Sequence, residues 1–309
     1  MKVLDAHTHF FSRAFFDLLA TEASNAGRAD PHRILESMAE NARIDLPEAS
    51  PAAHARRWVA ELDRHPVERA VTFASAPGEA SAVLEGCEAA AGRLIPYVVV
   101  DATSPETIEK GRDALSRLGF RGVLLFPALH RFDPAGAALD PLYREAEVRR
   151  AVVVVHSGIL QIKVRDLLGI RPAYDLRYAS PLHIAAAAER HPGVPFVIPH
   201  FGGGFFREAL VAGAQSPNIH VDTSSSNSWM RTQVEDLDLV RVFKKTLDVF
   251  GPERVLFGTD SSTFPRGWRA DLFDEQWRAL ETIGLAEADR ARIFGGNLLR
   301  LLGLDKRAG

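Results

Sequence analysis

The 309-residue chain contains one cysteine, Cys87, which excludes an internal disulfide framework and is typical of a reducing compartment. No segment approaches the ~20 consecutive apolar residues that a membrane-spanning helix needs, and no basic, cleavable leader precedes the first apolar segment. The net charge of −3 gives no footprint for nucleic acid or for an anionic membrane surface. We therefore expect a cytoplasmic protein that acts on a small molecule, with neither nucleic acid nor membrane as a partner.

Two common catalytic signatures are also missing. The glycine run Gly202–Gly204 is not part of a GxxxxGK[ST] phosphate loop, and a tight turn explains it as well. Several serines follow strand-like segments, among them Ser157, Ser224 and Ser261, but no G-x-S-x-G elbow surrounds any of them. Phosphate binding and nucleophilic serine catalysis are therefore disfavoured.

Short runs rich in Val, Ile, Leu and Phe recur along the chain, and helical patterns separate them. Nearly continuous apolar runs, such as VVVV before His156, are typical of strands that are buried on both faces, as in a parallel sheet. The runs cover residues 3–9, 69–75, 94–101, 122–127, 151–157, 195–201, 218–223 and 254–260. The intervening segments 105–118, 141–149, 181–190 and 237–250 carry apolar residues at helical spacing. Eight strand–helix repeats predict an α/β fold, a (β/α)8 TIM barrel.

One segment is longer than a minimal strand–helix unit requires. Residues 10–66 predict an extra helical insertion after strand one, and segments 128–140 and 158–180 are also long. Because all three follow strands, they should lie on the carboxyl-terminal rim, where barrel active sites are built. The ending GGNLLRLLGL predicts a helix that closes the barrel. We expect one barrel domain over residues 1–309.

Polar side chains collect where the predicted strands end. His7 and His9, two residues apart, share one face of strand one. The other such side chains end strands five, six and eight: His156, His200 and Asp260. Imidazoles plus a carboxylate suit Zn, Mn, Fe or Ni, and an incomplete protein shell leaves positions for water and substrate. The pattern therefore predicts a metal centre at the mouth of the barrel.

The order of these motifs resembles the amidohydrolase superfamily. The motifs are HTH in strand one, His156 after VVVV, PHFGG, VDTSS and GTDSS, together with FRGVLLFP and the final GGNLLRLLGL. The sequence is most similar to the amidohydrolase-2 branch, which includes aminocarboxymuconate-semialdehyde decarboxylase, related aromatic-acid decarboxylases and lactone hydrolases.

The resemblance implies that one divalent ion, Zn with Mn as the alternative, is bound by His7, His9, His156 and Asp260. It implies that His200 is an unligated catalytic histidine and that Asp260 also carries protons. Two-metal members place a bridging Lys or Glu at the end of strand four, where this chain has Phe126 and Pro127. Lys163 lies too far past strand five to fill that role convincingly, so a single ion is favoured. Related proteins often form dimers, so a homodimer is a possible assembly.

Further residues near the rim could orient the site or contact substrate. Arg266, in TFPRGW, could pair with a substrate carboxylate, and Arg207 is a weaker candidate for the same role. Ser224 could donate a hydrogen bond to substrate. Asp5 shares the face of His7 and His9 but lies deeper in the strand, so we expect it to orient a ligand.

Three functions fit this site. We expect a metal-dependent hydrolase that activates water to cleave a small lactone, amide or related carbonyl compound. The alternative is a non-oxidative decarboxylase (carboxy-lyase) of an aromatic or enoic acid, in which Asp260 or His200 protonates the carbon that loses carbon dioxide. A non-catalytic metal-binding protein is less favoured, because the ligand set leaves open coordination positions beside long rim loops.

Overall fold

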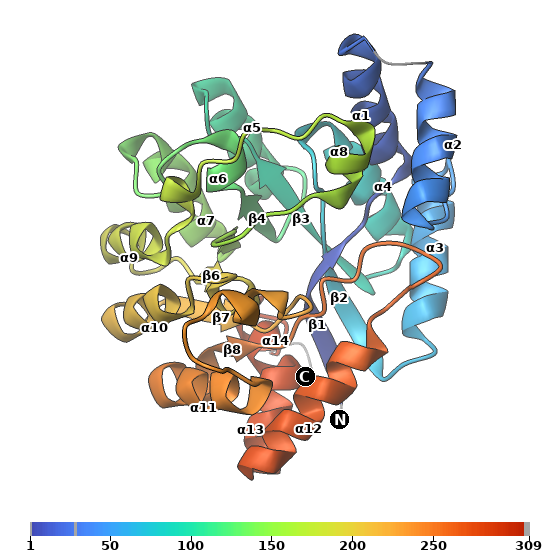
Figure 1. Ribbon diagram of the computed structural model, residues 1–309. Helices are drawn as coiled ribbons and strands as arrows, with labels where there is room; N and C mark the ends of the chain where they lie inside the picture. Colours follow the sequence, from blue (N-terminus) through green and yellow to red (C-terminus); the bar gives the residue numbers. More distant parts are fainter. Residues whose placement is uncertain (1, 28–29, 306–309) are drawn as a thin grey trace.

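The computed structural model describes residues 2–27 and 30–305, and its sheet has the predicted architecture (Figure 1). Eight parallel strands follow one another in chain order, so each strand pairs with the next one along the chain. They are β1 (Val3–His9), β2 (Val67–Phe73), β3 (Leu94–Val100), β4 (Gly122–Leu125), β5 (Val152–Val155), β6 (Phe196–Ile198), β7 (Ile219–Asp222) and β8 (Val255–Leu256). The predicted (β/α)8 TIM barrel is confirmed.

The two ends of the sheet meet through main-chain hydrogen bonds. The amide of Ala6 donates to the carbonyl of Phe257 at 2.8 Å, and the amide of His9 donates to the carbonyl of Ser261 at 2.8 Å. A parallel bridge between Thr8 and Ser261 continues this pairing beyond the end of β8. The segment that carries Asp260 is therefore hydrogen-bonded directly to the strand that carries His7 and His9.

Helices surround the barrel and also form the insertion. Those of the insertion are α1 (Arg13–Asn25), α2 (Pro31–Ala42) and α3 (Pro51–Leu62), as the length of segment 10–66 predicts. The remaining α-helices are α4 (Ala80–Ala89), α5 (Pro105–Ser116), α6 (Pro127–His130), α7 (Asp140–Arg149), α8 (Lys163–Leu168), α9 (Pro181–Arg190), α10 (Phe206–Gln215), α11 (Leu239–Phe250), α12 (Ala270–Ile283), α13 (Glu287–Ala291) and α14 (Asn297–Leu301). Among the described residues, none of these helices is long and apolar enough to cross a membrane.

Most predicted boundaries lie within two residues of the observed ones, but the last strand is much shorter than expected. The prediction extended it to Asp260, whereas β8 ends at Leu256. After Leu256 the chain turns toward β1. Asp260 has a positive φ of 58°, which lies outside the range that residues in a β-strand adopt. The apolar run therefore predicted the position of the strand correctly and its length wrongly.

Three separate apolar clusters stabilise the molecule. One fills the barrel interior. Leu298 of α14 and Leu302, just after this helix, belong to the same cluster and close one end of the barrel, as predicted. A second joins the outer faces of the strands to the surrounding helices. The third lies outside the barrel and joins α1 and α2 to Leu168 of α8, which lies beside α1 in Figure 1. The insertion is therefore packed against the long segment after β5 and has a small core of its own.

Candidate metal centre

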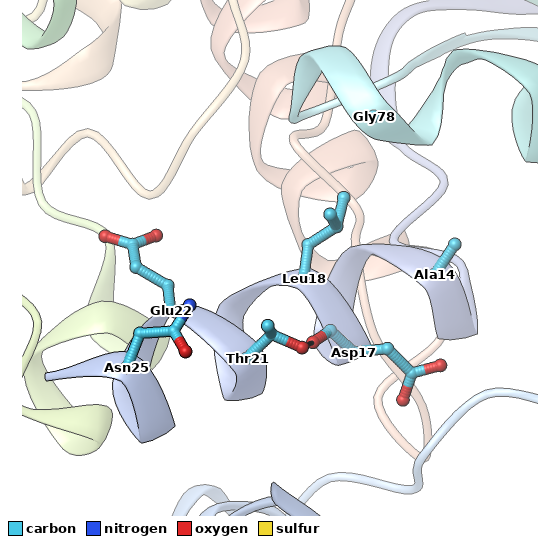
Figure 2. A pocket seen from close by; sticks show the side chains of 7 residues that line it. All are labelled: Ala14, Asp17, Leu18, Thr21, Glu22, Asn25 and Gly78. Carbon is cyan, nitrogen blue, oxygen red and sulfur yellow. Dashed lines mark hydrogen bonds between the residues drawn. The ribbon is translucent and has the colours of Figure 1, made fainter. Parts of the chain in front are cut away.

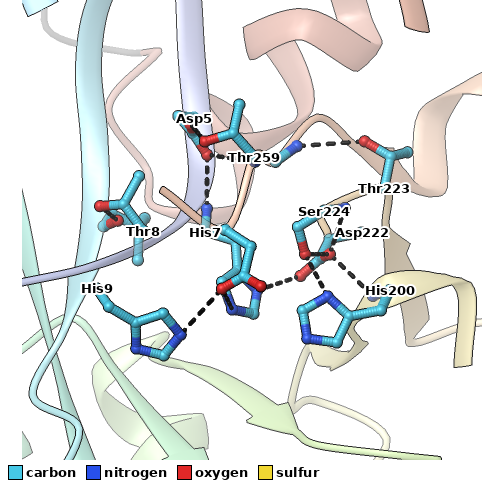
Figure 3. A network of polar contacts seen from close by, with 12 residues as sticks. Asp5, His7, Thr8, His9, His200, Asp222, Thr223, Ser224 and Thr259 are labelled. Atoms are coloured by element: carbon cyan, nitrogen blue, oxygen red, sulfur yellow. Dashed lines mark hydrogen bonds and ion pairs between the residues drawn. The ribbon is translucent and has the colours of Figure 1, made fainter. Parts of the chain in front are cut away.

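The side chains of His7 and His9 on β1 lie side by side near His200 (Figure 3), and the carboxylate of Asp260, which follows β8, approaches both of them. The Nε2 atom of His9 lies 3.2 Å from Oδ1 of Asp260, and Nε2 of His7 lies 3.9 Å from the same oxygen. These three residues each offer one ligand atom within 4.8 Å of the others. The geometry fits a cation bound by two imidazoles and a carboxylate.

His200 and His156 complete the ring of histidines. The ring of His200 lies 4.8 Å from that of His7 and 5.3 Å from that of His156, measured between centroids. Nδ1 of His156 is buried and has no hydrogen-bond partner among the described residues. A buried ring nitrogen without a partner is costly. A bound cation would supply the missing partner, so the environment of His156 fits the predicted ligand role.

The sequence analysis missed Asp222, which ends β7 and is buried beneath the histidines. Its Oδ2 accepts a hydrogen bond from Nδ1 of His7 at 2.8 Å. Its Oδ1 accepts from the amide of His200 at 3.1 Å, and from the amide of Ser224 at 3.0 Å. The position of Asp222, a charged residue at the end of a buried strand within VDTSS, was the available signal.

The hydrogen bonds of Asp222 determine which ring nitrogens are free. A carboxylate only accepts, so Nδ1 of His7 carries a proton; burial would lower the pKa of this ring, but the charge of Asp222 outweighs burial and raises it. The hydroxyl of Ser224 donates to Asp222 and lies 2.8 Å from Nδ1 of His200. That hydroxyl must therefore accept from Nδ1–H of His200, which leaves Nε2 of His200 unprotonated.

Asp222 also lies within ligand distance of His7 and His200. Both of its oxygens already accept hydrogen bonds from these residues and from Ser224, so we assign it the role of orienting ligands and not of binding the ion. Burial alone would raise its pKa, but the adjacent His7 and His200 outweigh burial and lower the pKa to about 2. Asp222 is therefore a buried carboxylate at neutral pH.

Burial and neighbouring charges set the protonation of the ligand residues. Burial lowers the pKa of His9, and it lowers the pKa values of His156 and His200 together with the positive charge of neighbouring histidines. Burial would raise the pKa of Asp260, but its hydrogen bond with His9 and the nearby histidines hold it well below the usual value. Neutral imidazoles beside an ionised carboxylate are the forms that bind a cation.

Asp5, which we expected from the sequence to orient a ligand, is buried deeper on β1 and is hydrogen-bonded to the main chain of the same segments. Its Oδ1 accepts the amides of His7 at 2.9 Å and of Thr259 at 3.2 Å. Its Oδ2 accepts Nε1–H of Trp268 at 2.8 Å and the hydroxyl of Thr259 at 2.5 Å. Burial raises the pKa of Asp5 to about 6 despite these donors. Asp5 thus fixes the segment that precedes Asp260 relative to the strand that bears His7.

The backbone is strained at two of these residues. His200 and Asp260 have φ values of 58°, a region that residues other than glycine rarely adopt. The amide of Asp260 donates to the carbonyl of His7 at 2.8 Å, and Oδ1 of Asp222 accepts the amide of His200. These hydrogen bonds maintain both conformations and aim the two side chains.

The three residues predicted to contact substrate lie in different places. Arg266 donates to Oγ of Ser262 at 3.0 Å, and its charge interacts with that of Asp260. Ser224 is fully buried behind His200. The side chain of Arg207 is 86% exposed and lies 3.8 Å from Glu208 on α10. In the structure the charge of Arg266 acts on Asp260, Ser224 contacts His200, and Arg207 is exposed on α10.

A groove elsewhere on the surface has none of this chemistry. It has a volume of about 570 Å³ and lies along the outer face of α1, with Gly78 opposite (Figure 2). Its lining residues are Ala14, Asp17, Leu18, Thr21, Glu22, Asn25 and Gly78. None of the histidines of the metal centre contributes to it.

Comparison with known proteins gives a match over nearly the whole chain. The model of the amidohydrolase family matches residues 4–304.

Solved structures share the fold at low sequence identity. Dihydroxybenzoic acid decarboxylase from Polaromonas sp. JS666, with bound manganese and an inhibitor, has a TM-score of 0.62 at 16% identity, covering 99% of this chain and 98% of that one. 5-Carboxyvanillate decarboxylase from Novosphingobium aromaticivorans, complexed with manganese, has 0.64 at 15%, covering 98% and 96%. A probable 2-pyrone-4,6-dicarboxylic acid hydrolase from Acinetobacter baumannii has 0.57 at 16%, covering 98% and 100%.

Proposed function

The chain belongs to the amidohydrolase family, and from that premise we propose that it is a metal-dependent carboxy-lyase that removes carbon dioxide from an aromatic or enoic acid. One observation carries the proposal: ligand atoms of His7, His9 and Asp260 converge at the barrel mouth. The free Nε2 of His200 belongs to a ring that packs against the ring of His7.

One divalent ion would be held by His7, His9 and Asp260, with His156 as the fourth protein ligand. The unpartnered Nδ1 of His156 and the lowered pKa values of His9 and His156 support this ligand set. Manganese in two of the similar decarboxylases supports Mn²⁺ at least as well as Zn²⁺. When bound, such an ion polarises the oxygen atoms of the substrate as a Lewis acid.

The residues around the ligands would bind the acid and move the proton. Arg266 is our candidate to pair with a substrate carboxylate, because its charge interacts with that of Asp260. The side chain of Asp260 is 36% exposed, whereas His200 is only 8% exposed. We therefore assign to Asp260 the final delivery of the proton. The pKa values of Asp260 and His200 are both lowered, so neither group holds that proton at neutral pH; it comes from solvent water, and Nε2 of His200 takes it up and passes it on to Asp260.

The balance of the reaction is simple. The carbon–carboxylate bond breaks, carbon dioxide leaves, and the electron pair stays on the ring or alkene carbon, which then takes one proton. Aromatic side chains border the site: Phe73 packs against the ring of His7 at 4.7 Å and Phe126 against that of His156 at 5.5 Å. Both phenylalanines are buried behind these rings and make the surroundings of the site apolar, which suits a planar, unsaturated acid.

Hydrolysis of a lactone is the second candidate, because a probable pyrone dicarboxylate hydrolase shares the fold over the full chain. The same residues would then serve water activation, with Nε2 of His200 as the base. The decarboxylases among the similar structures favour carboxy-lyase activity over our expectation from the sequence, which was hydrolysis.

A substrate panel separates the two reactions. Purified enzyme loaded with Mn²⁺ or Zn²⁺ is incubated with hydroxylated benzoic acids and with pyrone and aliphatic lactones, and carbon dioxide and ring-opened acid are quantified separately. We expect carbon dioxide from at least one aromatic acid and no release from the His200→Asn variant. Lactone opening without carbon dioxide release from any acid would refute the carboxy-lyase proposal and establish the hydrolase.

A further inference from the structure

Glu79 is a fully buried carboxyl that joins two chain segments far apart in sequence. It ends the short 3-10 helix Pro77–Glu79 that precedes α4. Its Oε1 accepts the amide of Ser12 at 2.6 Å, and its Oε2 accepts the amide of Ser75 at 2.7 Å. Each oxygen is therefore committed to the main chain of a different segment.

The two segments differ in what they carry. Oγ of Ser75 lies 2.6 Å from Nδ1 of His9, whose Nε2 approaches Asp260. Ser12 is the N-cap of α1, since its hydroxyl accepts the amide of Phe15 at 3.3 Å. Glu79 thus lies between a proposed metal ligand and the first helix of the insertion.

The buried carboxyl of Glu79 is costly, but its two oxygens match the two main-chain donors that face it. No salt bridge pairs Glu79 with a cation among the described residues, and burial raises the pKa of its carboxyl to about 7 despite the amide donors. Burying an ionisable group without a counter-charge costs free energy. Two converging N–H donors do require two acceptor oxygens, however, and a glutamine would place its own N–H₂ against one of them.

We propose that Glu79 is a positioning residue for the metal centre: by fixing Ser75, it holds the ring of His9 with Nδ1–H directed to Ser75 Oγ and Nε2 directed to the ion. By fixing Ser12, the same carboxyl ties the start of the insertion to this ligand. The inference rests on the proposed role of His9 as a metal ligand. Hydrogen bonds connect Glu79 to Ser75 and Ser75 to His9, and they reach no other proposed ligand.

The test compares Glu79→Gln with a matched clamp at the other end of the barrel. Asn297 is buried, and its side-chain amide donates to the carbonyls of Pro252 at 2.7 Å and Val255 at 2.8 Å. Asn297→Asp keeps the shape of this side chain and removes both hydrogen bonds, so it is a matched control. Mn²⁺ dissociation constants are measured by isothermal titration calorimetry. We expect Glu79→Gln to weaken binding by about 10–100-fold and Asn297→Asp to change it by less than about twofold.

A second readout needs no metal. In the metal-free protein, the ¹⁵N shifts of the His9 ring report its tautomer. Without the ion, Nε2 of His9 faces the Asp260 carboxylate at 3.2 Å and donates to it, so we expect a single Nε2–H tautomer, with Nδ1 accepting from the Ser75 hydroxyl, in the wild type and a mixture of tautomers in Glu79→Gln. Ser75→Ala keeps Glu79 and removes only the acceptor of His9, so it should also weaken Mn²⁺ binding if Glu79→Gln does not fold.

The outcomes distinguish this inference from the function on which it rests. Unchanged Mn²⁺ affinity in Glu79→Gln or Ser75→Ala, or equal losses in Glu79→Gln and Asn297→Asp, would overturn the positioning role. A wild type that binds neither Mn²⁺ nor Zn²⁺ would instead remove the proposed metal-dependent function. The tautomer measurement would still decide whether Glu79 orients His9.

Discussion

The two sides of the barrel mouth hold their histidines in different ways. On the β1 side, His7 donates to Asp222, and His9 is hydrogen-bonded to Ser75. On the β5 side, His156 is equally buried, but its Nδ1 has no partner among the described residues. The protein alone orients the first two rings, whereas His156 has an unmet requirement that a cation would satisfy.

This contrast separates His7 and His9, whose rings are held by hydrogen bonds within the protein, from His156, whose Nδ1 would gain a partner only from a bound cation. His7, Asp222 and His200 form one buried network, whose charges compensate one another. His156 stands outside that network and contacts Phe126 and His200 by ring packing. We expect substitutions on the two sides to differ in their effects on metal binding, catalysis and stability.

The largest effect is expected from Asp260→Ala. It removes the only carboxylate of the proposed ligand set, so we expect metal affinity to fall by more than about 100-fold and activity to reach background. Metal content after dialysis and carbon dioxide release are the measurements. Asp113→Ala, which removes an ion pair with Arg117 on the outer helix α5, is the control and should retain both. Stoichiometric metal in Asp260→Ala would show that Asp260 is not a ligand.

His200→Asn should separate catalysis from binding. Because Nδ1 of His200 is held by Ser224 and its Nε2 is assigned to proton transfer, we expect metal to stay bound while kcat falls about 10²–10⁴-fold. Metal analysis and kcat are measured on the same preparation. Loss of the ion together with activity would make His200 a ligand and would favour a second metal position.

Stability of the metal-free protein sharpens the comparison directly. His7→Asn leaves Asp222 as a buried, uncompensated charge, so we expect a loss of about 3–5 kcal/mol in the free energy of unfolding. His156→Asn loses no hydrogen bond at Nδ1, so its loss should be closer to about 1 kcal/mol. Urea unfolding in the presence of a chelator measures both. Equal losses would mean that the two sides are supported alike.

The last prediction concerns pH. Burial raises the pKa of Glu79 from 4.5 to about 7, so the folded protein binds the extra proton and is stabilised below pH 4.5. That contribution is lost as pH rises toward 7. The difference in unfolding free energy between wild type and Glu79→Gln should therefore decrease from pH 4.5 to 7 and level off above it. If the difference in unfolding free energy instead grew from pH 4.5 to 7, folding would lower the pKa of Glu79, contrary to this account.

The sequence predicted the barrel because its signals are local. Apolar runs mark buried parallel strands, and spacing two residues apart placed His7 and His9 on one face of β1. His156, His200 and Asp260 could be grouped because barrel topology brings strand ends together. The fold and the set of candidate ligands were therefore within reach of sequence reasoning.

What the sequence could not predict are contacts that depend on side-chain direction between distant segments. Asp222 is 215 residues from His7, and nothing local shows that its oxygens would accept from His7 and His200. Glu79 lies in a short helical turn and is indistinguishable by pattern from a surface glutamate. Arg207 and Arg266 both follow strand-end motifs, but only the fold shows that Arg207 is exposed and that the charge of Arg266 interacts with Asp260.

The most direct test of the proposed centre is anomalous diffraction from crystals of the Mn²⁺-loaded protein. We expect one anomalous peak per chain, about 2.0–2.2 Å from ring nitrogens of His7, His9 and His156 and from an oxygen of Asp260. Asp222 should be hydrogen-bonded to His7 and outside the coordination shell. No peak at the barrel mouth, two peaks, or a peak bound by Asp222 would contradict a single ion held by these four residues.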